Sequence, residues 1–529
     1  MTPVSPDKFL SRANLDQVGG EVARPAYLDR VGAEVGRPAC LDRVDGEVAR
    51  PDPDWPRADV ARTAEGRTTL RSANQRQAPL PTGIVHFGPG AFHRVHQAWY
   101  VDKLLADDPR WSICGVSLRS SEVRDALAPQ DGLYTVATLD EHVSFQVIGS
   151  LREILVAPED PERVLARLSA PTTRVVTITV TEKGYCLDAA GDLDTHHTDI
   201  QRDLRQPYRP TSLIGFLVEG LRRRRDEAHP LTVISCDNLI DNGARLARAV
   251  GQFADLREPG LSHWIEDHVR FPRTMVDSIT PATTDELRAR VSGVLGMEDR
   301  WPVQRESFVQ WVLEDRLAGG GPDWASAGVT LTDDVAGYDH AKLRLLNGAH
   351  SSLAYLGLLA GHENVADAMG DERLSSLVTT MMKEDVRPTL RAPRGLDLNA
   401  YIDAILRRFR NPAIRHALAQ IAWDGSQKLP IRLLGTIRDS LDAGRPIERL
   451  CVPIAGWMHF VRRQAARGER VTDPLAERLF AVGRACQNRS RLDVPKFVGV
   501  REVFPERLVQ DATFINALAR AYDDLAVGG

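Results

Sequence analysis

Residues 83–90 read GIVHFGPG, a short apolar run that passes directly into a turn containing two glycines. The run predicts a buried strand, and the turn precedes a helix that we expect over residues 91–107. Backbone approaches a pyrophosphate closely only where residues lack a Cβ atom, and the start of a helix favours an anion. The fingerprint GxGxxG is incomplete, because its last position is His93. The turn therefore indicates a dinucleotide site, and a plain tight turn is the alternative.

Four further strand signals follow the turn, at residues 111–118, 144–148, 175–181 and 231–235. The third reads VVTITVT and is β-branched almost throughout, which is typical of a central strand buried on both faces. Strands that alternate with helical stretches predict a parallel α/β sheet domain over residues 79–284. Beyond it long amphipathic stretches dominate, among them residues 308–317, so we expect an all-α domain over residues 285–529.

The first 78 residues differ from the rest of the chain. The pattern LDxVxxEVxRP occurs three times with a period of 13 residues, at 15–25, 28–38 and 41–51. Each copy ends in proline, which breaks helices, and offers few apolar side chains. We therefore expect residues 1–78 to be a disordered or weakly structured extension that buries nothing, or residues added by an upstream start codon. A small docking element is the alternative.

The chain of 529 residues has 67 Lys and Arg against 72 Asp and Glu, so its formal net charge is −5. This balance excludes a chain-wide basic surface for nucleic acid. The longest apolar runs are far shorter than the ~20 residues of a membrane span, and the N-terminus lacks the apolar core of a secretory signal. Six scattered cysteines without a CxxC pair indicate neither a disulfide framework nor a structural zinc site. We expect a reduced, cytoplasmic protein without metal, nucleic-acid or membrane partners, whose oligomeric state stays open, a monomer included.

The second expected strand ends at Leu118 and is followed by Arg119 and Ser120. An acidic residue at this point would bind the ribose 2′-hydroxyl of NAD. None stands there, and Arg119 could instead bind the 2′-phosphate of NADP. The residues alone therefore leave the choice between NAD and NADP open.

Residues 342–350, KLRLLNGAH, are the most informative stretch. On a helix Asn347 and His350 share a face, and the stem of Lys342 is long enough to reach the same pocket. Burial in an apolar wall lowers the pKa of a lysine, so that Lys342 could exchange a proton with an alcohol. Asn347 can donate a hydrogen bond to an oxygen that gains charge, and His350 can orient the lysine or a substrate hydroxyl. The alternative is an amphipathic helix with a polar edge.

Three polar segments could join this pocket. Residues 235–238 (SCDN) and 181–185 (TEKGY) follow two of the expected strands, where α/β sheets place their sites. Residues 271–284 lead across the presumed domain junction. Taken singly, each segment is more often a loop with capping residues.

Seven stretches together resemble the polyol-specific long-chain dehydrogenases, also called the mannitol dehydrogenase family, over about residues 84–526. In chain order they are IVHFGPGAFHRVHQAWYVDKLL, TVTEKGYC, SCDNLIDNG, FPRTMVDSITPATT, FVQWVLED, KLRLLNGAHSSLAYLG and DGSQKLPIRLL. The resemblance implies an α/β Rossmann-type N-terminal domain plus a mostly α-helical C-terminal domain, with the site in the cleft between them. It also implies zinc-free hydride transfer between a nicotinamide cofactor, NAD, and a small-molecule substrate, a ketose or its acid.

The family's motifs imply roles for individual residues of this chain. Lys342 matches the general acid/base, and Asn238 and Asn347 match the pair that holds the reacting oxygen. His350 matches a residue that binds substrate and orients the lysine, and Asp277 matches an acidic residue near that lysine, which we assign to the substrate site. The residues expected at the cofactor are Gly88, Gly90, Ala91, Phe92, Arg119 and Thr181.

Within the family, TEKGYC is similar to the fructuronate reductases (D-mannonate oxidoreductases), whereas mannitol 2-dehydrogenases tend to have glycine in place of Lys183. A substrate carboxylate needs a cation, and the expected substrate-binding cations are Lys183, Arg415 and Lys428. The resemblance implies the reaction D-fructuronate + NADH + H⁺ ⇌ D-mannonate + NAD⁺. The alternatives are mannitol 2-dehydrogenase activity on D-fructose and D-mannitol, or another ketose, polyol or tagaturonate-type reductase of the family.

Overall fold

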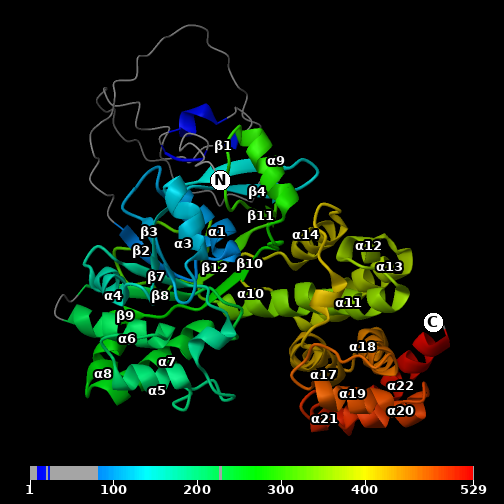
Figure 1. The fold of residues 1–529 in the computed structure, drawn as a ribbon. Coiled ribbons are helices and arrows are strands. Elements are labelled where there is room, and N and C mark those ends of the chain that lie inside the picture. The colour runs from blue at the N-terminus through cyan, green and yellow to red at the C-terminus, as the bar shows by residue number, and fades with distance from the viewer. Residues whose placement is uncertain (1–8, 13, 19–21, 24–81, 226–228, 528–529) are drawn as a thin grey trace, which may run out of the picture.

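The computed structural model describes residues 9–12, 14–18, 22–23, 82–225 and 229–527. Figure 1 shows one part built from strands and helices and a second part built from helices. The first part ends with β13 (Thr330–Thr332), and the second runs from α10 (Val335–Ala341) to the C-terminus. Within the described ranges, no helix is both long and apolar enough to cross a membrane.

The first part is organised around a parallel sheet with the strand order β6-β3-β2-β7-β8-β9. Its strands are β2 (Thr82–Phe87), β3 (Ser112–Ser117), β6 (Leu151–Val156), β7 (Val175–Ile178), β8 (Leu231–Ser235) and β9 (Val269–Arg270). Numbered along the chain within this sheet, the order is 3-2-1-4-5-6, so the winding reverses between β2 and β7. Rossmann-type folds have this order and bind dinucleotides at the reversal. The predicted parallel α/β sheet is confirmed.

Alternate residues of β2 face two layers of helices. Val85 and Phe87 belong to one buried cluster and Ile84 to another, as expected for a strand covered on both faces. The helices of the first layer are α4 (Pro161–Ser169), α5 (Thr198–Arg205), α6 (Leu213–Arg224), α7 (Asn242–Arg257) and α8 (Leu261–His268). Those of the second are α1 (Ala91–Val95), α2 (Gln97–Leu104) and α3 (Glu122–Leu127), so the single helix predicted over residues 91–107 is interrupted, at His96.

Two smaller sheets extend the first part beyond residue 284. Their strand orders are β1-β5-β4-β11 and β10-β12-β13. The strands are β1 (Val22–Ala23), β4 (Tyr134–Leu139), β5 (Ser144–Ile148), β10 (Thr274–Asp277), β11 (Val303–Glu306), β12 (Gln310–Glu314) and β13 (Thr330–Thr332). Strand β11 pairs with β4, and β12 pairs with β10, so residues beyond 284 still pack with the sheet part. The helical part therefore begins after β13 and not at residue 285, where the sequence predicts the boundary.

The helix predicted at residues 308–317 is wrong, because this stretch contains β12. Trp311 and Leu313 belong to one buried cluster and Val312 to another, so neighbouring side chains point to opposite faces, as in a strand. The strand predicted at residues 144–148 is confirmed as β5, but it pairs antiparallel with β4 outside the six-stranded sheet.

The first described residues pack against the sheet part. Strand β1 pairs in parallel with β5, and four side chains are buried against β4, β5 and helix α9 (Asp285–Leu295), namely Leu10, Leu15, Val18 and Val22. The expectation that residues 1–78 bury nothing is therefore wrong for the described residues up to Ala23, where the first repeat copy supplies apolar anchors. The second and third copies lie outside the described residues.

The second part is a bundle of helices around one buried cluster, which confirms the mostly α-helical C-terminal domain. Its helices are α10 (Val335–Ala341), α11 (Gly348–Ala360), α12 (Val365–Gly370), α13 (Glu372–Thr380), α14 (Leu398–Arg410), α15 (Leu418–Ile421), α16 (Gly425–Leu429), α17 (Gly435–Asp442), α18 (Glu448–Ala466), α19 (Ala476–Arg484), α20 (Ser490–Val498), α21 (Glu506–Val509) and α22 (Ala512–Val527). The π-helical segments η7 (Lys342–Asn347), η8 (Met381–Val386) and η10 (Pro430–Leu434) are inserted between them.

Candidate active site

A cavity of about 410 Å³ lies where the winding of the sheet reverses, and we call it the cofactor cavity. The turn after β2, the end of β3 and the residues after β7 line it. Four of the residues predicted at the cofactor are among its lining residues: Gly88, Gly90, Arg119 and Thr181. Ala91 and Phe92 begin α1 directly after the turn and do not line the cavity.

The two glycines of the turn are needed for different reasons. Gly88 has a φ of +86°, and a Cβ atom there would lie 2.0 Å from the carbonyl oxygen of Thr179, so glycine lets β2 and β7 approach each other. A Cβ atom on Gly90 would meet only the carbonyl oxygen of Gly88, at 3.9 Å. The described protein therefore leaves free the space beside Gly90 that a pyrophosphate would fill, so the turn fits a dinucleotide.

A second cavity, of about 660 Å³, lies between the ends of β8 and β10 and the helical part, and we call it the substrate cavity. Its lining combines residues of the sheet part, such as Asn238, with Lys342 and Asn347 of the helical part. The segment after β7 borders both cavities, because Lys183 lines the cofactor cavity and Glu182 lines the substrate cavity.

Lys342 begins the π-helical segment η7, in which hydrogen bonds join residues five apart. This geometry directs Lys342 and Asn347 to the same cavity. The Lys342 ammonium group donates to Oδ1 of Asn238 at 2.8 Å and to the carbonyl oxygen of Val276. The structure thus brings together three predicted residues that come from distant parts of the sequence.

Asp277 lies behind Lys342 and does not line the substrate cavity. Arg408 of α14 donates to both oxygens of Asp277, at 2.8 and 3.1 Å, and to both oxygens of Glu306, at 2.6 and 2.7 Å. Burial acts to raise the pKa of Asp277, but the charges of Arg408 and Lys342 outweigh it and lower this pKa. Sequence reasoning missed Arg408 and Glu306, because ion pairs between distant residues leave no local pattern.

The electrostatic setting of Lys342 follows from the same cluster. Burial lowers the pKa of Lys342, while the carboxylates of Asp277 and Asp339 act in the opposite direction. A lowered pKa makes it easier for a buried amine to release and take up a proton, which fits the acid/base role predicted for Lys342.

His350 lies one helical turn beyond Asn347 and is buried among rings. Its centroid is 4.5 Å from that of Phe409 and 5.2 Å from that of His416. Burial lowers the pKa of His350 far below its usual value, and the charges of its neighbours add to this, so the imidazole is neutral. Its Nε2 atom is buried without a hydrogen-bond partner among the described residues, and His350 is not among the residues that line the substrate cavity, so the structure does not bring its ring together with Lys342 and Asn347. Lys342 itself is oriented by Asn238 and Val276.

The three predicted substrate-binding cations occupy different places. Lys183 is exposed and lines the cofactor cavity, and Arg415 is exposed outside both cavities. Lys428 lines the substrate cavity, as does Arg432 four residues later. Burial lowers the pKa of Arg432 to about 10, and burial together with Arg432 lowers that of Lys428. Sequence reasoning missed Arg432, although its spacing from Lys428 is that of one helical turn.

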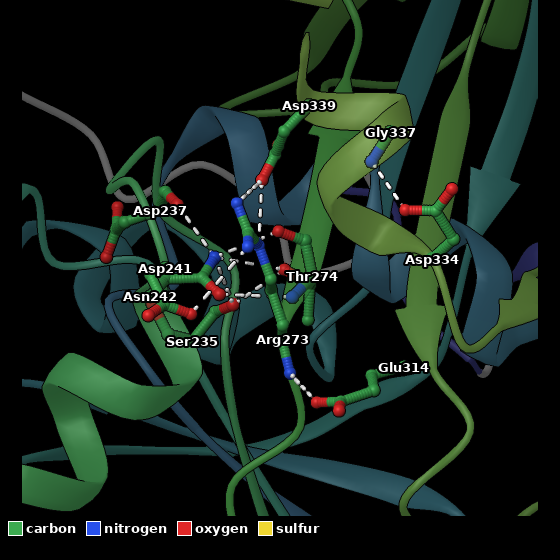
Figure 2. Close-up of polar contacts among 10 residues, drawn as sticks. All are labelled: Ser235, Asp237, Asp241, Asn242, Arg273, Thr274, Glu314, Asp334, Gly337 and Asp339. Atoms are coloured by element: carbon green, nitrogen blue, oxygen red, sulfur yellow. Dashed lines mark hydrogen bonds and ion pairs between the residues drawn. The ribbon is translucent and has the colours of Figure 1, made fainter. Parts of the chain in front are cut away.

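Figure 2 shows the polar contacts that fix the ends of β8 and β10 beside the substrate cavity. The side-chain amide of Asn242 donates to the carbonyl oxygens of Ser235 and Thr274, at 3.2 and 3.1 Å, and accepts from the Thr274 N–H at 3.0 Å. Arg273 donates to Asp339 of α10 at 2.7 Å. These contacts tie β8 to β10 and β10 to the helix that precedes Lys342.

The part of the chain that the structure describes offers no candidate metal-binding site. No group of three or more His, Cys, Asp and Glu side chains there is arranged to hold a metal ion.

Comparisons with known proteins agree with this architecture. The mannitol dehydrogenase Rossmann domain matches residues 82–326, and the mannitol dehydrogenase C-terminal domain matches residues 334–526. The chain is 41% identical to D-mannonate oxidoreductase of Escherichia coli (strain K12) over 460 residues, which are 85% of this chain and 94% of that protein.

Two solved structures match almost the whole chain. One is mannitol 2-dehydrogenase of Pseudomonas fluorescens in a ternary complex with NAD and D-mannitol, with 34% identity, a TM-score of 0.76 and 98% of both chains covered. The other is a substrate-free D-sorbitol dehydrogenase, with 31% identity, a TM-score of 0.80, and 98% of this chain and 100% of that chain covered.

Proposed function

The chain belongs to the mannitol dehydrogenase family, and on this premise we propose that it is an NAD-dependent oxidoreductase that interconverts D-fructuronate and D-mannonate. The similarity to the E. coli D-mannonate oxidoreductase supports the sugar acid, and the NAD complex of the mannitol 2-dehydrogenase supports the cofactor. Gly88, Gly90, Arg119 and Thr181 would hold the dinucleotide in the cofactor cavity.

The observation that carries the sugar acid is a pair of partly buried cations that line the substrate cavity, Lys428 and Arg432. The Arg432 guanidinium donates to the hydroxyl of Ser351 at 3.1 Å, and the Lys428 ammonium to the carbonyl oxygen of Ile421 at 3.5 Å. Three carboxylates lie close enough to Lys428 to act against the lowering of its pKa, those of Asp424, Asp473 and Glu182. Among the described residues, no carboxylate is one of the groups that shift the pKa of Arg432. Burying a cation without a counter-ion is costly, and a substrate carboxylate would supply one to Arg432.

The nicotinamide supplies or receives the hydride when the cofactor is bound. Lys342 exchanges the proton with the substrate. Two of the three N–H positions of its ammonium group donate to Asn238 and to the carbonyl oxygen of Val276, so the third position is free to face the substrate. In ketone reduction the third N–H donates its proton to the carbonyl oxygen of the substrate. In alcohol oxidation the neutral amine has a lone pair at this position, which accepts the proton of the substrate hydroxyl. The amide groups of Asn238 and Asn347 can donate to the same oxygen as it gains charge.

The test is a panel of D-fructuronate, D-tagaturonate, D-fructose and D-xylulose with NADH and with NADPH, followed by the absorbance of the reduced nicotinamide. We expect the largest kcat/KM for D-fructuronate with NADH. An equal or larger kcat/KM for D-fructose would instead establish the mannitol 2-dehydrogenase activity, and a larger one for D-tagaturonate would establish the epimeric uronate.

The role of the cation pair is tested by Arg432→Met. Loss of a charge-assisted hydrogen bond should lower kcat/KM for the sugar acid by about 10- to 100-fold and leave that for neutral ketoses nearly unchanged. The control is Arg415→Met, which removes an exposed arginine outside both cavities and should change neither value. Equal losses on acidic and neutral substrates would remove Arg432 from carboxylate binding.

A further inference from the structure

Thr181 has a backbone conformation that threonine rarely adopts, and it lies between the two cavities. Its φ is 68° and its ψ is 164°, a region populated almost only by glycine. A β-branched residue is held in such a conformation only where its surroundings force it. The contacts around Thr181 therefore show which groups hold its backbone at a positive φ.

The carboxylate of Asp237, directly after β8, is the group that holds Thr181. Its Oδ1 accepts the N–H of Thr181 at 3.1 Å, and its Oδ2 accepts the N–H of Val180 at 3.0 Å and the hydroxyl of Tyr185 at 2.8 Å. The Tyr185 hydroxyl is also 2.6 Å from that of Ser235. The partly buried carboxylate of Asp237 thus binds residues at both ends of a short turn and fixes them beside the end of β8.

The other side of this turn is fixed to the cofactor turn. The Thr179 hydroxyl donates to the carbonyl oxygen of Gly88 at 2.8 Å, and His86 contacts the same hydroxyl at 2.9 Å. Residues 180–184, which we call the dividing segment, are therefore anchored to the ends of β2, β7 and β8 at once.

Neighbouring residues of the dividing segment face different cavities. Val180, Thr181, Lys183 and Gly184 line the cofactor cavity, whereas Glu182 lines the substrate cavity together with Asp237. The dividing segment separates the cavities, so its position sets the distance between a hydride donor in one cavity and an acceptor in the other. A displacement of the reacting groups by about 1 Å can lower the rate by about 100-fold.

We propose that Asp237 is a positioning residue that holds the dividing segment in its strained form and thereby aligns the cofactor cavity with the substrate cavity. The inference rests on the proposed dehydrogenase function but on neither sugar in particular. Asp237 needs no contact with either ligand to act in this way, because its hydrogen bonds fix the backbone that separates them.

The test is a double-mutant cycle between Asp237→Asn and Thr181→Gly, measured as kcat with saturating NADH and whichever ketose of the panel is turned over. Asparagine offers one acceptor oxygen in place of two, so Asp237→Asn should lower kcat by about 10- to 100-fold when Thr181 is present. Glycine adopts a positive φ without a clamp, so the same substitution should cost less than about threefold in the Thr181→Gly background.

A purely electrostatic or purely structural effect of Asp237 would cost the same factor in both backgrounds, and that result would overturn the proposal. Thermal unfolding and NADH binding, followed by protein fluorescence, identify variants that fold and bind cofactor. If Asp237→Asn does not fold, Tyr185→Phe replaces it in the cycle, because it removes one donor to the carboxylate; it should show a smaller loss with the same dependence on Thr181. The wild-type substrate panel tests the sugar acid separately, since the cycle compares variants on one substrate.

Discussion

The two cavities share the dividing segment but are built in different ways. The cofactor cavity is lined mainly by turns at the ends of three strands of one sheet. The substrate cavity is lined by charged side chains from both parts of the chain. The buried ion pairs of Arg408 with Asp277 and Glu306 lie behind it and join the two parts. The cofactor cavity therefore requires only local turns and the strand order of one sheet. The substrate cavity requires that the two domains dock and that the buried charges between them are paired. Substitutions should therefore separate turnover, domain docking and cofactor affinity.

The largest effect is expected at the proton-transfer group of the substrate cavity. Lys342→Ala should lower kcat by about 1,000-fold or more, since it removes the only group placed to exchange the proton in the proposed mechanism. NADH affinity, measured by fluorescence titration, should stay within about twofold, because Lys342 does not line the cofactor cavity. Activity retained in this variant would remove the proposed acid/base, and lost NADH binding would mean that the two cavities are not separate.

The next effect concerns the docking of the two parts. Arg408→Met leaves Asp277 and Glu306 buried without their partner, which should lower the free energy of unfolding by about 3–5 kcal/mol in urea titrations. The matched control is Arg478→Met, which breaks an exposed pair with Glu502 and should cost less than about 1 kcal/mol. Similar costs for the two variants would mean that the buried cluster does not hold the domains together.

The glycine turn gives a smaller effect that distinguishes folding from cofactor binding. Gly88→Ala forces a Cβ atom against the carbonyl of Thr179 at a positive φ, so it should cost about 3 kcal/mol in stability. Gly90→Ala meets no such obstacle and should change stability by less than about 1 kcal/mol, but weaken NADH binding by about tenfold, because the methyl group occupies the space beside the turn. Unchanged NADH affinity in Gly90→Ala would contradict the assignment of this cavity to the cofactor.

The smallest effect is a shift in pH dependence. Since burial lowers the pKa of Lys342, kcat/KM for D-mannonate oxidation should rise with pH through a pKa below that of free lysine, and ketone reduction should fall over the same range. The carboxylate of Asp339 acts to raise this pKa, so Asp339→Asn should move both midpoints to lower pH. A midpoint that moves to higher pH would show that Lys342 is not the group that titrates.

The fold could be predicted where the pattern of one segment was sufficient. The strand at Leu231–Ser235 has the bounds that its apolar run predicts, and so does Ser144–Ile148. The sheet to which Ser144–Ile148 belongs could not be predicted, because a strand's pattern does not name its partner. The stretch around Trp311 was predicted as helix because its polar positions also fit a helical period, and pairing with β10 decided otherwise.

The gathering of Lys342, Asn238 and Asn347 in one cavity could be predicted, because each of the three stands in a family motif of its own. The site could not be predicted where neighbouring residues point to different places. Lys183 follows Glu182 in the sequence, but the positive φ of Thr181 starts a tight turn that directs them to different cavities. The partner of Asp277 could not be predicted either, because Arg408 is brought to it only by the docking of the helical part.

Strand β1 has a consequence for how the molecules behave in solution. A bare sheet edge offers unpaired N–H and C=O groups to other chains, and β5 would form such an edge if β1 did not cover it. A chain begun at Thr82 would also uncover Phe145 and the apolar face of α9. We expect such a shortened chain to keep its chemistry but to aggregate more readily than the full chain, which light scattering would measure, and the first repeat copy would then contribute to colloidal stability.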